Sequence, residues 1–358
     1  METRFCSLNK IPLIYLYYSF ILAFSDYQIK IKLDFESFKK LLKVRDIKLN
    51  RSFGIFLDGN IDLEIKSYFE NELTLLLYSN INKNMNFSLE EIKKIPISFV
   101  LLGERKDVTI YLEDQNKRLH FKKAVYDSGT GTIPKFRKMG FSKLVINEIK
   151  DKLKKLKIDG FILEVLQDNK KAINLYLNAS FSISRKFYCF NIEKEKLKQN
   201  IDLYLRENKE SYESIINKIK IKKMKNIFWL KEKDIIKFCK TPISWQNNIK
   251  SIKNIFSKIS LLALYYDKKL IGLSAIEKSN GDIKFFGVDN NKVKVDNNIN
   301  LLDKNFIFLS ILLDKLINES ESKMISILNV DKNCSIYDFL NFIGFNNFIN
   351  QYEMYIKI

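Results

Sequence analysis

The spacing of apolar residues divides the chain into segments typical of helices and segments typical of strands. An amphipathic helix is predicted from residue 141 to residue 156, with one face formed by Phe141, Leu144, Val145, Ile149, Leu153 and Leu156. Strand-like runs lie on either side of it, at Ala124–Tyr126 and at Phe161–Val165, where Glu164 interrupts an apolar stretch. Asn169 then stands where a helix N-cap belongs, and Phe181 opens another strand. This order of strands and helices predicts a mixed α/β fold.

The N-terminal third predicts further elements. The apolar run from Ile11 to Phe24 is shorter than the roughly 20 residues of a membrane span, and no small-residue cleavage site follows it, so we expect a buried first helix. A helix at 35–42 and a strand at 52–57 come next. Three strands at 97–102, 108–113 and 119–127, with turns at 103–105 and 114–116, predict an antiparallel meander. Residues 60–95 fit this pattern poorly and are interpreted as an insertion with helical character near 89–94.

The turn that leads into the helix at 141 has features of a phosphate site. It reads Arg137-x-x-Gly140-x-Ser142, and the first N–H groups of a helix lack partners within it and attract anions. Gly140 lets the backbone approach a ligand closely. The surrounding positive side chains, which suit a ligand with a further phosphate, are Lys135, Arg137, Lys138 and Lys143. The alternative is an ordinary strand-to-helix connection with a solvated basic rim.

Together these motifs resemble the central motifs of the GNAT superfamily, the acetyl-coenzyme-A-dependent N-acyltransferases. The resemblance spans about residues 120–190, in matching order and spacing. It rests on Arg137-x-x-Gly140-x-Ser142, Leu163-Glu164-Val165, Asn169-x-x-Ala172-Ile173-x-Leu175-Tyr176 and Phe181. The family usually has Gly at the positions of Lys138 and Ser180, and Gly or Ala at that of Ser142. The segments 23–27 and 126–131 are similar to a bacterial subgroup of the family.

The resemblance implies roles for individual residues. Acetyl-CoA would be held by Thr132, Ile133, Arg137, Lys138, Met139, Gly140, Phe141, Ser142, Lys143 and Asn169. Glu164 would be the general base for the acceptor amine, and Tyr176 would protonate the departing thiolate. The alternatives are a structural Glu164 that hydrogen-bonds a splayed strand and a half-buried core Tyr176. No metal is implied.

The second half of the chain repeats the first in reduced form. Asn333 and Phe345 have the separation of Asn169 and Phe181, and this alignment places Leu340 at the position of Tyr176. If the turn before Asn333 is one residue shorter than the turn before Asn169, Asn329 stands at the position of Glu164. Between Val288 and Phe306 the sequence has an Asn-rich stretch and no Arg-x-x-Gly turn. We therefore predict two tandem GNAT-like domains, each a mixed, mostly antiparallel twisted sheet flanked by helices, with splayed central strands and the working cofactor site in the first. The expected boundaries are 1–195 and 226–358, joined by a helical linker at 196–225.

Composition changes this picture little. The 61 Lys and Arg residues give a net charge of +19, but the chain has only eight arginines and its lysines are spread throughout. This distribution favours a solvated surface over a nucleic-acid site. The four cysteines lack paired spacing, which argues against zinc and disulfides and favours a reducing, cytoplasmic location. Neither a nucleic acid nor a membrane is expected as a partner.

The expected function is transfer of an acetyl group from acetyl-CoA to a primary amine, by direct attack in a ternary complex. The acceptor, a small molecule or a peptide, is not specified by the sequence. Two alternatives stay open. One is a non-catalytic protein that binds acyl-CoA. The other is an aminoacyl-tRNA-dependent transferase of tandem GNAT-like fold, a class that usually lacks the pyrophosphate turn present at 137–142.

Overall fold

The computed structural model describes residues 1–26, 33–77, 85–227, 230–289 and 301–358. Within these residues the strands form one twisted sheet of twelve, in the order β1-β2-β3-β4-β5-β12-β6-β11-β10-β9-β8-β7. The strands are β1 (Glu2–Ser7), β2 (Phe53–Asp58), β3 (Pro96–Leu112), β4 (Lys117–Thr132), β5 (Gly160–Leu166), β6 (Ser182–Glu193), β7 (Ile219–Lys223), β8 (Ile259–Tyr266), β9 (Lys269–Glu277), β10 (Asp282–Val288), β11 (Met324–Asp331) and β12 (Asn346–Lys357). The α-helices are α1 (Leu13–Ala23), α2 (Phe35–Val44), α3 (Leu63–Leu77), α4 (Leu89–Ile92), α5 (Phe141–Lys155), α6 (Lys170–Asn178), α7 (Lys194–Glu207), α8 (Lys209–Ile216), α9 (Glu232–Cys239), α10 (Ile249–Asn254), α11 (Leu301–Ile317) and α12 (Tyr337–Phe342).

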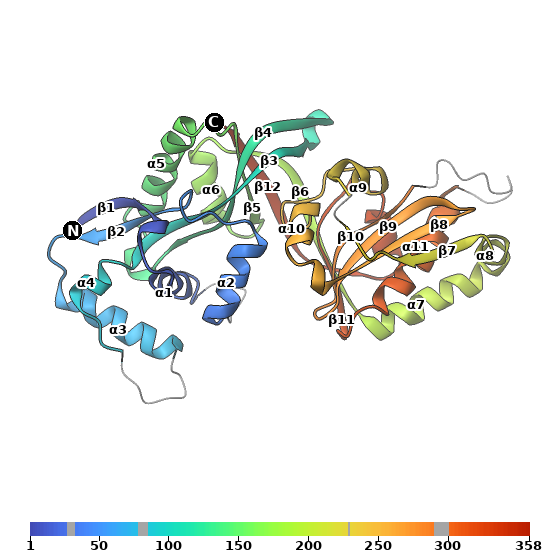
Figure 1. The fold of residues 1–358 in the computed structure, drawn as a ribbon, viewed down its shortest axis with the longest axis horizontal. Coiled ribbons are helices and arrows are strands. Elements are labelled where there is room, and N and C mark those ends of the chain that lie inside the picture. Colours follow the sequence, from blue (N-terminus) through green and yellow to red (C-terminus); the bar gives the residue numbers. More distant parts are fainter. Residues whose placement is uncertain (27–32, 78–84, 228–229, 290–300) are drawn as a thin grey trace.

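The two halves of the chain form two lobes that lie side by side (Figure 1). The blue to green elements, α1 to α6 with β1 to β5, make up the first lobe. The yellow to red elements make up most of the second, but the C-terminal strand β12 runs back among the strands of the first. Each lobe therefore contains the same succession of strands, with β7 to β11 repeating β1 to β5.

The lobes exchange their last strands. β12, from the second half, pairs antiparallel with β5, whereas β6, from the first half, pairs antiparallel with β11. The two exchanged strands also pair with each other, and Phe187 lies opposite Gln351. Phe187 and Gln351 are 164 positions apart in the sequence, the same separation as between the equivalent residues Asn169 and Asn333. Phe187 and Gln351 are thus equivalent residues of the two halves that pair with each other, so the local twofold axis that relates the halves passes through this pair. The tandem arrangement predicted from the repeat is confirmed, and the sequence boundaries at 195 and 226 stay a prediction.

The central strands of the first lobe splay apart. β4 and β5 are parallel and pair from Ala124 with Gly160 to Asp127 with Leu163. Beyond that point β4 continues to Thr132 without pairing to β5, so a slot opens between their C-terminal ends. β10 and β11 repeat this arrangement in the second lobe, where only two residue pairs join them in parallel.

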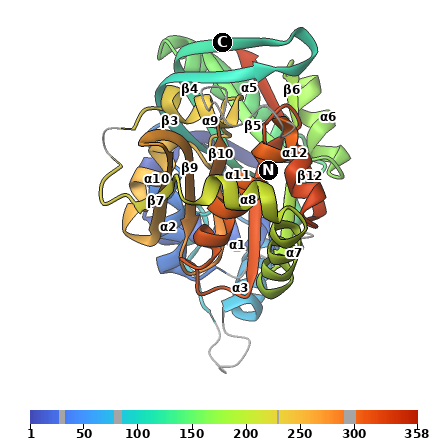
Figure 2. The same ribbon diagram turned by 90° about the vertical axis from the view of Figure 1, so that its right-hand side faces the viewer.

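One prediction in this region is wrong. The residues 103–105, expected to form a turn, continue the single long strand β3, which pairs with β4 along nearly its whole length. Gly103 is a glycine for a different reason, because a Cβ atom there would lie 2.5 Å from the Arg45 carbonyl oxygen. The turn at 114–116 is confirmed. The resulting hairpin reaches over the second lobe (Figures 1 and 2), where Arg118 donates a hydrogen bond of 3.2 Å to the Lys240 carbonyl.

The expected insertion at 60–95 and the expected linker after residue 195 both take part in the fold. The stretch 60–95 contains α3 and α4, and Phe69 and Leu73 of α3 lie in the core of the first lobe. The predicted helical stretch after residue 195 forms α7 and α8 and then the edge strand β7. Leu197 and Ile201 of α7 are buried in the core of the second lobe, so these residues join the halves as part of the second core.

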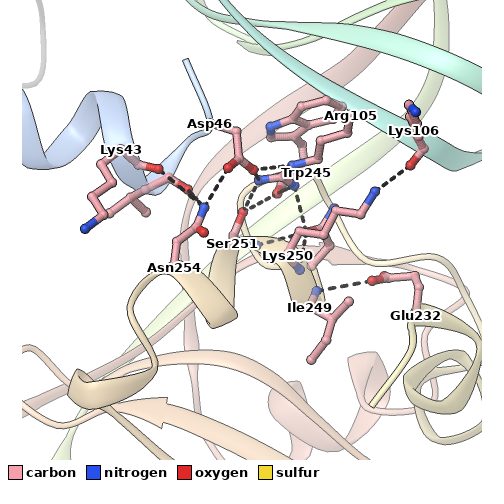
Figure 3. A network of polar contacts seen from close by, with 12 residues as sticks. Lys43, Asp46, Arg105, Lys106, Glu232, Trp245, Ile249, Lys250, Ser251 and Asn254 are labelled. Carbon is pink, nitrogen blue, oxygen red and sulfur yellow. Dashed lines mark hydrogen bonds and ion pairs between the residues drawn. The ribbon is translucent and has the colours of Figure 1, made fainter. Parts of the chain in front are cut away.

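A buried polar network connects the two lobes (Figure 3). Arg105 of β3 pairs with Asp46 at 2.7 Å and donates hydrogen bonds to the Trp245 carbonyl oxygen, to Asn248 and to Ser251. Its guanidinium also lies 4.3 Å from the centre of the Trp245 ring. Because Arg105 is only 4 % exposed, these contacts satisfy a charge that would otherwise be costly to bury.

Among the described residues, none of the helices combines the length and the apolar character that a membrane span needs. The Asn-rich stretch between Val288 and Phe306, where the sequence has no phosphate-binding turn, falls largely on residues 290–300, outside the described residues.

Candidate functional site

A cavity of about 780 Å³ opens where β4 and β5 splay apart. The end of β4, the turn after it and the start of α5 form one wall, and the start of α6 forms another. The C-terminal end of α1 closes the side with Ala23, Phe24 and Asp26. The cavity therefore lies at the N-termini of two helices, where unpaired N–H groups and the helix dipoles favour an anion.

The turn into α5 has the open geometry that the sequence predicted. Gly140 is the N-cap residue with φ +82°, and a Cβ atom built on it would meet nothing within 4 Å. The first helical hydrogen bond runs from the Leu144 N–H to the Gly140 carbonyl at 3.0 Å. The N–H groups of residues 141 to 143 precede it and have no partner within the helix. Lys138 also has a positive φ, of +65°, so the backbone curls around the cavity mouth.

Arg137 braces this turn. Its guanidinium forms a two-pronged ion pair with Asp26, at 2.5 and 2.8 Å, and donates to the backbone carbonyls of Ala23 and Thr132. The hydrogen bonds from Arg137 hold the pKa of Asp26 below its ordinary value. Arg137 thus ties the end of α1 to the end of β4, and its positive charge is largely compensated by Asp26.

The positive charge at the cavity comes mainly from lysines. Lys138 and Lys143 lie on the α5 side and Lys170 and Lys171 on the α6 side, and all four line the cavity. Asn169 caps α6 as predicted, since its Oδ1 atom accepts a 3.1 Å hydrogen bond from the Ala172 N–H. An anionic ligand would therefore meet cationic side chains on two walls.

Tyr176 reaches the inner end of the cavity from α6. It lines the cavity, and its ring packs edge-on against Phe181 with 5.5 Å between the centroids. Its hydroxyl donates a 2.9 Å hydrogen bond to Oδ2 of Asp127, the last β4 residue paired with β5. The sequence suggested no role for Asp127, because only the fold brings this carboxylate to the hydroxyl of a residue 49 positions away.

Glu164 lies on the opposite face of the sheet. Side chains alternate along β5, so Leu163 and Val165 point toward the helices of the first core whereas Glu164 points toward the second lobe. Its Oε2 atom accepts hydrogen bonds from Tyr126 at 3.0 Å, Gln246 at 2.6 Å and Asn329 at 2.7 Å.

The environment of Glu164 changes its acidity. The residue as a whole is partly buried, but Oε1 is fully buried and has no hydrogen-bond partner in the described part of the chain. Burial raises the pKa of Glu164 to about 7, and repulsion from Glu353 acts in the same direction, against the hydrogen bonds from Tyr126 and Gln246. Such a carboxylate can exchange a proton near neutral pH.

The structure brings most of the predicted cofactor residues together. Those that line the cavity are Thr132, Arg137, Lys138, Gly140, Phe141, Ser142, Lys143 and Asn169. Ile133 is buried in the core of the first lobe instead, and Met139 is 56 % exposed on the outer side of the turn. Neither side chain borders the cavity, although the backbone of each belongs to the turn.

The described part of the second lobe has a small cavity at the splay of β10 and β11. Its volume is about 30 Å³, and the residues that border it include Cys239, Lys284, Asn329 and Asp331; the segment 290–300 that follows β10 lies outside the described residues. Leu340, at the position of Tyr176, is fully buried in the second core. Asn329, at the position of Glu164, donates to Glu164 itself.

Comparison with known proteins agrees with this geometry. Residues 64–181 match the sequence model of the acetyltransferase (GNAT) family. The chain therefore carries a GNAT-family domain, and the match begins within the segment that the sequence marked as an insertion. No curated protein matches the sequence.

Solved structures extend the likeness to both halves. A tandem GNAT protein from the clavulanic acid biosynthesis pathway matches 99 % of this chain and 98 % of its own, with a TM-score of 0.55 and 8 % identity. A GCN5-related N-acetyltransferase from Sphaerobacter thermophilus matches 99 % and 95 %, with a TM-score of 0.51 and 10 % identity. One from Kribbella flavida matches 99 % and 71 %, with a TM-score of 0.50 and 8 % identity. At these identities the likeness shows a shared fold, and that fold is the tandem GNAT arrangement.

Proposed function

We propose that the chain is an N-acetyltransferase that moves an acetyl group from acetyl-CoA to a primary amine by direct attack in a ternary complex. The observation that carries the proposal is the cavity at the splay of β4 and β5. It combines the open N-terminus of α5, a Gly140 that leaves room for a ligand, and lysines on two walls. Its volume lies within the range of about 300–1,000 Å³ typical of ligand sites.

The residues that would hold acetyl-CoA fit its chemistry. The N–H groups at the start of α5 suit the pyrophosphate, and the lysines suit a further phosphate. The end of β4 at Thr132 and Ile133, which no longer pairs with β5, offers backbone groups to the pantetheine amides, as an added strand would. When bound there, acetyl-CoA supplies the activated thioester.

Two side chains would move protons in this reaction. Tyr176, at the inner end of the cavity, would hold a proton at its hydroxyl for the leaving thiolate. Glu164 would accept the proton of the attacking amine, because its raised pKa suits a base that works near neutral pH. Since Glu164 faces the second lobe, the acceptor would approach from that face of the sheet.

Calorimetry with acetyl-CoA, followed by release of coenzyme A in the presence of an amine panel, tests the proposal. The panel contains small amines, peptides with free N-termini and lysine-containing peptides. Binding together with amine-dependent release is the expected result. Binding without release from any amine would favour a non-catalytic acyl-CoA-binding protein, and absence of binding would contradict both.

Tyr176→Phe refines the test. The ring stays and only the hydroxyl is lost, so we expect kcat to fall about a hundredfold, toward the lower end of the general acid range. Acetyl-CoA affinity should change far less, because the lysines and the α5 turn are untouched. Turnover at the wild-type rate, with chemistry rate-limiting, would show that Tyr176 is only a packing residue.

A further inference from the structure

Two cysteines that are distant in the sequence meet in the second lobe. Cys239 is the last residue of α9, and Cys334 lies between β11 and α12, 95 positions further along the chain. The Ser335 N–H donates a 3.4 Å hydrogen bond to the Cys239 carbonyl, and the Ser335 hydroxyl donates one of 2.8 Å to the Phe238 carbonyl. Cys334 also packs against the core cluster that contains Cys239, and the two free thiols are hydrogen-bonded to each other.

This backbone contact brings the two residues within reach of a disulfide. Covalent geometry puts the Cys334 Cα about 2.4 Å from the Ser335 nitrogen, and the Cys239 Cα about as far from its own carbonyl oxygen. With the 3.4 Å hydrogen bond between them, the two Cα atoms are at most about 8 Å apart, and disulfides span Cα separations of about 4.4–6.8 Å. Because the thiols also hydrogen-bond to each other, the side chains point toward one another, as a bond between the sulfurs requires.

The pair lies at the second lobe's counterpart of the large cavity. α9 follows β7 as α1 follows β1, so Cys239 ends α9 as Ala23 ends α1. Cys334 lies 164 positions after Lys170, the separation of equivalent residues in the two halves. Ala23 and Lys170 border the large cavity of the first lobe, and both cysteines border the small cavity of the second. The described residues leave about 30 Å³ there, room for about two water molecules and so for a small oxidant.

The two thiols differ in the way that a reactive pair requires. Cys239 is only 3 % exposed, whereas Cys334 is half-buried and within reach of solvent. The hydrogen bond from Cys239 lowers the pKa of Cys334. Hydrogen bonds from the Ile336 backbone and from Thr241 act in the same direction, against burial and repulsion from Asp331. The contact with Cys334, together with burial, raises the pKa of Cys239 well above its ordinary value. Cys334 is therefore the better nucleophile of the two.

We propose that Cys239 and Cys334 are a redox-sensitive dithiol, which hydrogen peroxide or another small peroxide converts to an intrachain disulfide. The Cys334 thiolate attacks one peroxide oxygen, so that an S–O bond forms and the O–O bond breaks. The hydroxide that leaves takes up the proton that Cys334 had released to solvent. The Cys239 sulfur then attacks the resulting sulfenic acid, the S–S bond forms and the S–O bond breaks. This second hydroxide leaves with the Cys239 proton as water. The two thiols together lose two electrons, and the peroxide gains them and becomes two water molecules.

The alternative is that both thiols are ordinary packing side chains. The other two cysteines provide an internal comparison, since Cys6 is half-buried in β1 and the buried Cys189 contacts Asn329 and Gln351. Among the described residues, no three His, Cys, Asp or Glu side chains form a group that could hold a metal ion. A two-thiol pair lacks the four ligands of a structural zinc site, and redox chemistry needs only the two sulfurs.

Mass spectrometry of the folded full chain tests the inference. The reduced protein is treated with hydrogen peroxide near neutral pH, alkylated under denaturing conditions and digested without reductant. The chain should lose about two hydrogens in mass, and a peptide pair joining Cys239 to Cys334 should appear while Cys6 and Cys189 are alkylated. A thiol reductant should restore all four thiols, because a disulfide is reversible and a sulfinic acid is not. Four free thiols after treatment, any other pairing, or irreversible oxidation of this pair would overturn the proposal.

Single variants assign the roles of the two thiols. In Cys239→Ser the reaction should stop at the Cys334 sulfenic acid, which dimedone labels, whereas Cys334→Ser should be labelled about tenfold less. Cys6→Ser is the control and should form the disulfide like the wild type. Equal labelling of Cys239→Ser and Cys334→Ser would contradict the assigned order of attack. The wild-type experiment needs no variant, so the proposal stays testable if a variant fails to fold. None of these measurements uses acetyl-CoA, and acetyl transfer is judged separately by the amine panel.

Discussion

Replacing Glu164 with Gln should change how the stability of the protein depends on pH. The ordinary carboxyl pKa of Glu is 4.5, whereas burial in the folded chain raises it to about 7. Between these two values the folded state binds a proton that the unfolded state does not. The free energy of unfolding therefore falls as pH rises from about 4.5 to about 7, and this contribution is constant above the folded pKa.

The size of the effect follows from the two pKa values. Between pH 5 and pH 8 the free energy of unfolding of the wild type should fall by about 2.5 kcal/mol because of Glu164. This value follows because a tenfold change in proton affinity corresponds to about 1.4 kcal/mol. Glu164→Gln keeps the shape and an oxygen that can accept from Tyr126, Gln246 and Asn329, but it cannot titrate. The difference in stability between variant and wild type should therefore move by about 2.5 kcal/mol in favour of the variant over this range.

Denaturant unfolding at several pH values, followed by fluorescence, measures this difference. Trp245 is a suitable probe because it stacks on Tyr126, with 5.1 Å between the ring centroids, and Tyr126 donates to Glu164. Glu104→Gln is a matched control on β3. Glu104 pairs with Arg51 and Lys123, which hold its pKa below the ordinary value, so its removal should change the pH dependence in the opposite sense. Parallel pH curves for the wild type and Glu164→Gln would refute the assigned environment of Glu164.

Three further predictions concern the cofactor turn, the second lobe and the contact between the lobes. Gly140→Val should abolish acetyl-CoA binding in calorimetry, because Val is strained at φ +82° and its side chain would enter the open space of the cavity. Gly129→Ala is the control, since its Cβ atom would lie 3.9 Å from the nearest neighbouring atom. One acetyl-CoA should bind per chain, because the buried Leu340 stands at the position of Tyr176 and Asn329 at that of Glu164, and a calorimetric stoichiometry of two would contradict this. Arg105→Met should lower the free energy of unfolding by about 3–5 kcal/mol, because it removes the ion pair with Asp46 and the buried hydrogen bonds to Trp245, Asn248 and Ser251. Arg51→Met should cost under about 1 kcal/mol, and equal losses in chemical denaturation would speak against the buried network.

Short-range patterns predicted the elements that build the cavity. The helical spacing from Phe141 onward, the cap at Asn169 and the turn at Gly140 are each decided by residues close in sequence. The structure forms all three where they were expected. The turn predicted at residues 103–105 was wrong because the reason for Gly103 is not local. A glycine between two strand-like runs suggests a turn, but this one is required by the Arg45 backbone, which lies close to Gly103 in the fold and far from it in the sequence.

Long-range contacts explain what the sequence did not reveal. The local sequence of β6 and that of β12 do not disclose that the two strands exchange partners between the lobes. The partners of Glu164 are likewise distant, with Gln246 and Asn329 lying 82 and 165 positions further along the chain. Sequence motifs could name Glu164, but they could not show which face of the sheet it occupies.

The exchange also explains why the second lobe carries Asn329 where the first carries Glu164. The local twofold axis through Phe187 and Gln351 brings the two related positions together, and the Asn329 amide donates to Glu164 at 2.7 Å. A second carboxylate at this position would place two like charges in contact in a buried site, where Glu353 already repels Glu164. An amide at that position supplies a donor that a carboxylate cannot. The amide of Asn329 therefore allows Glu164 to be buried next to it, and the second lobe supplies a hydrogen-bond donor to this carboxylate of the first.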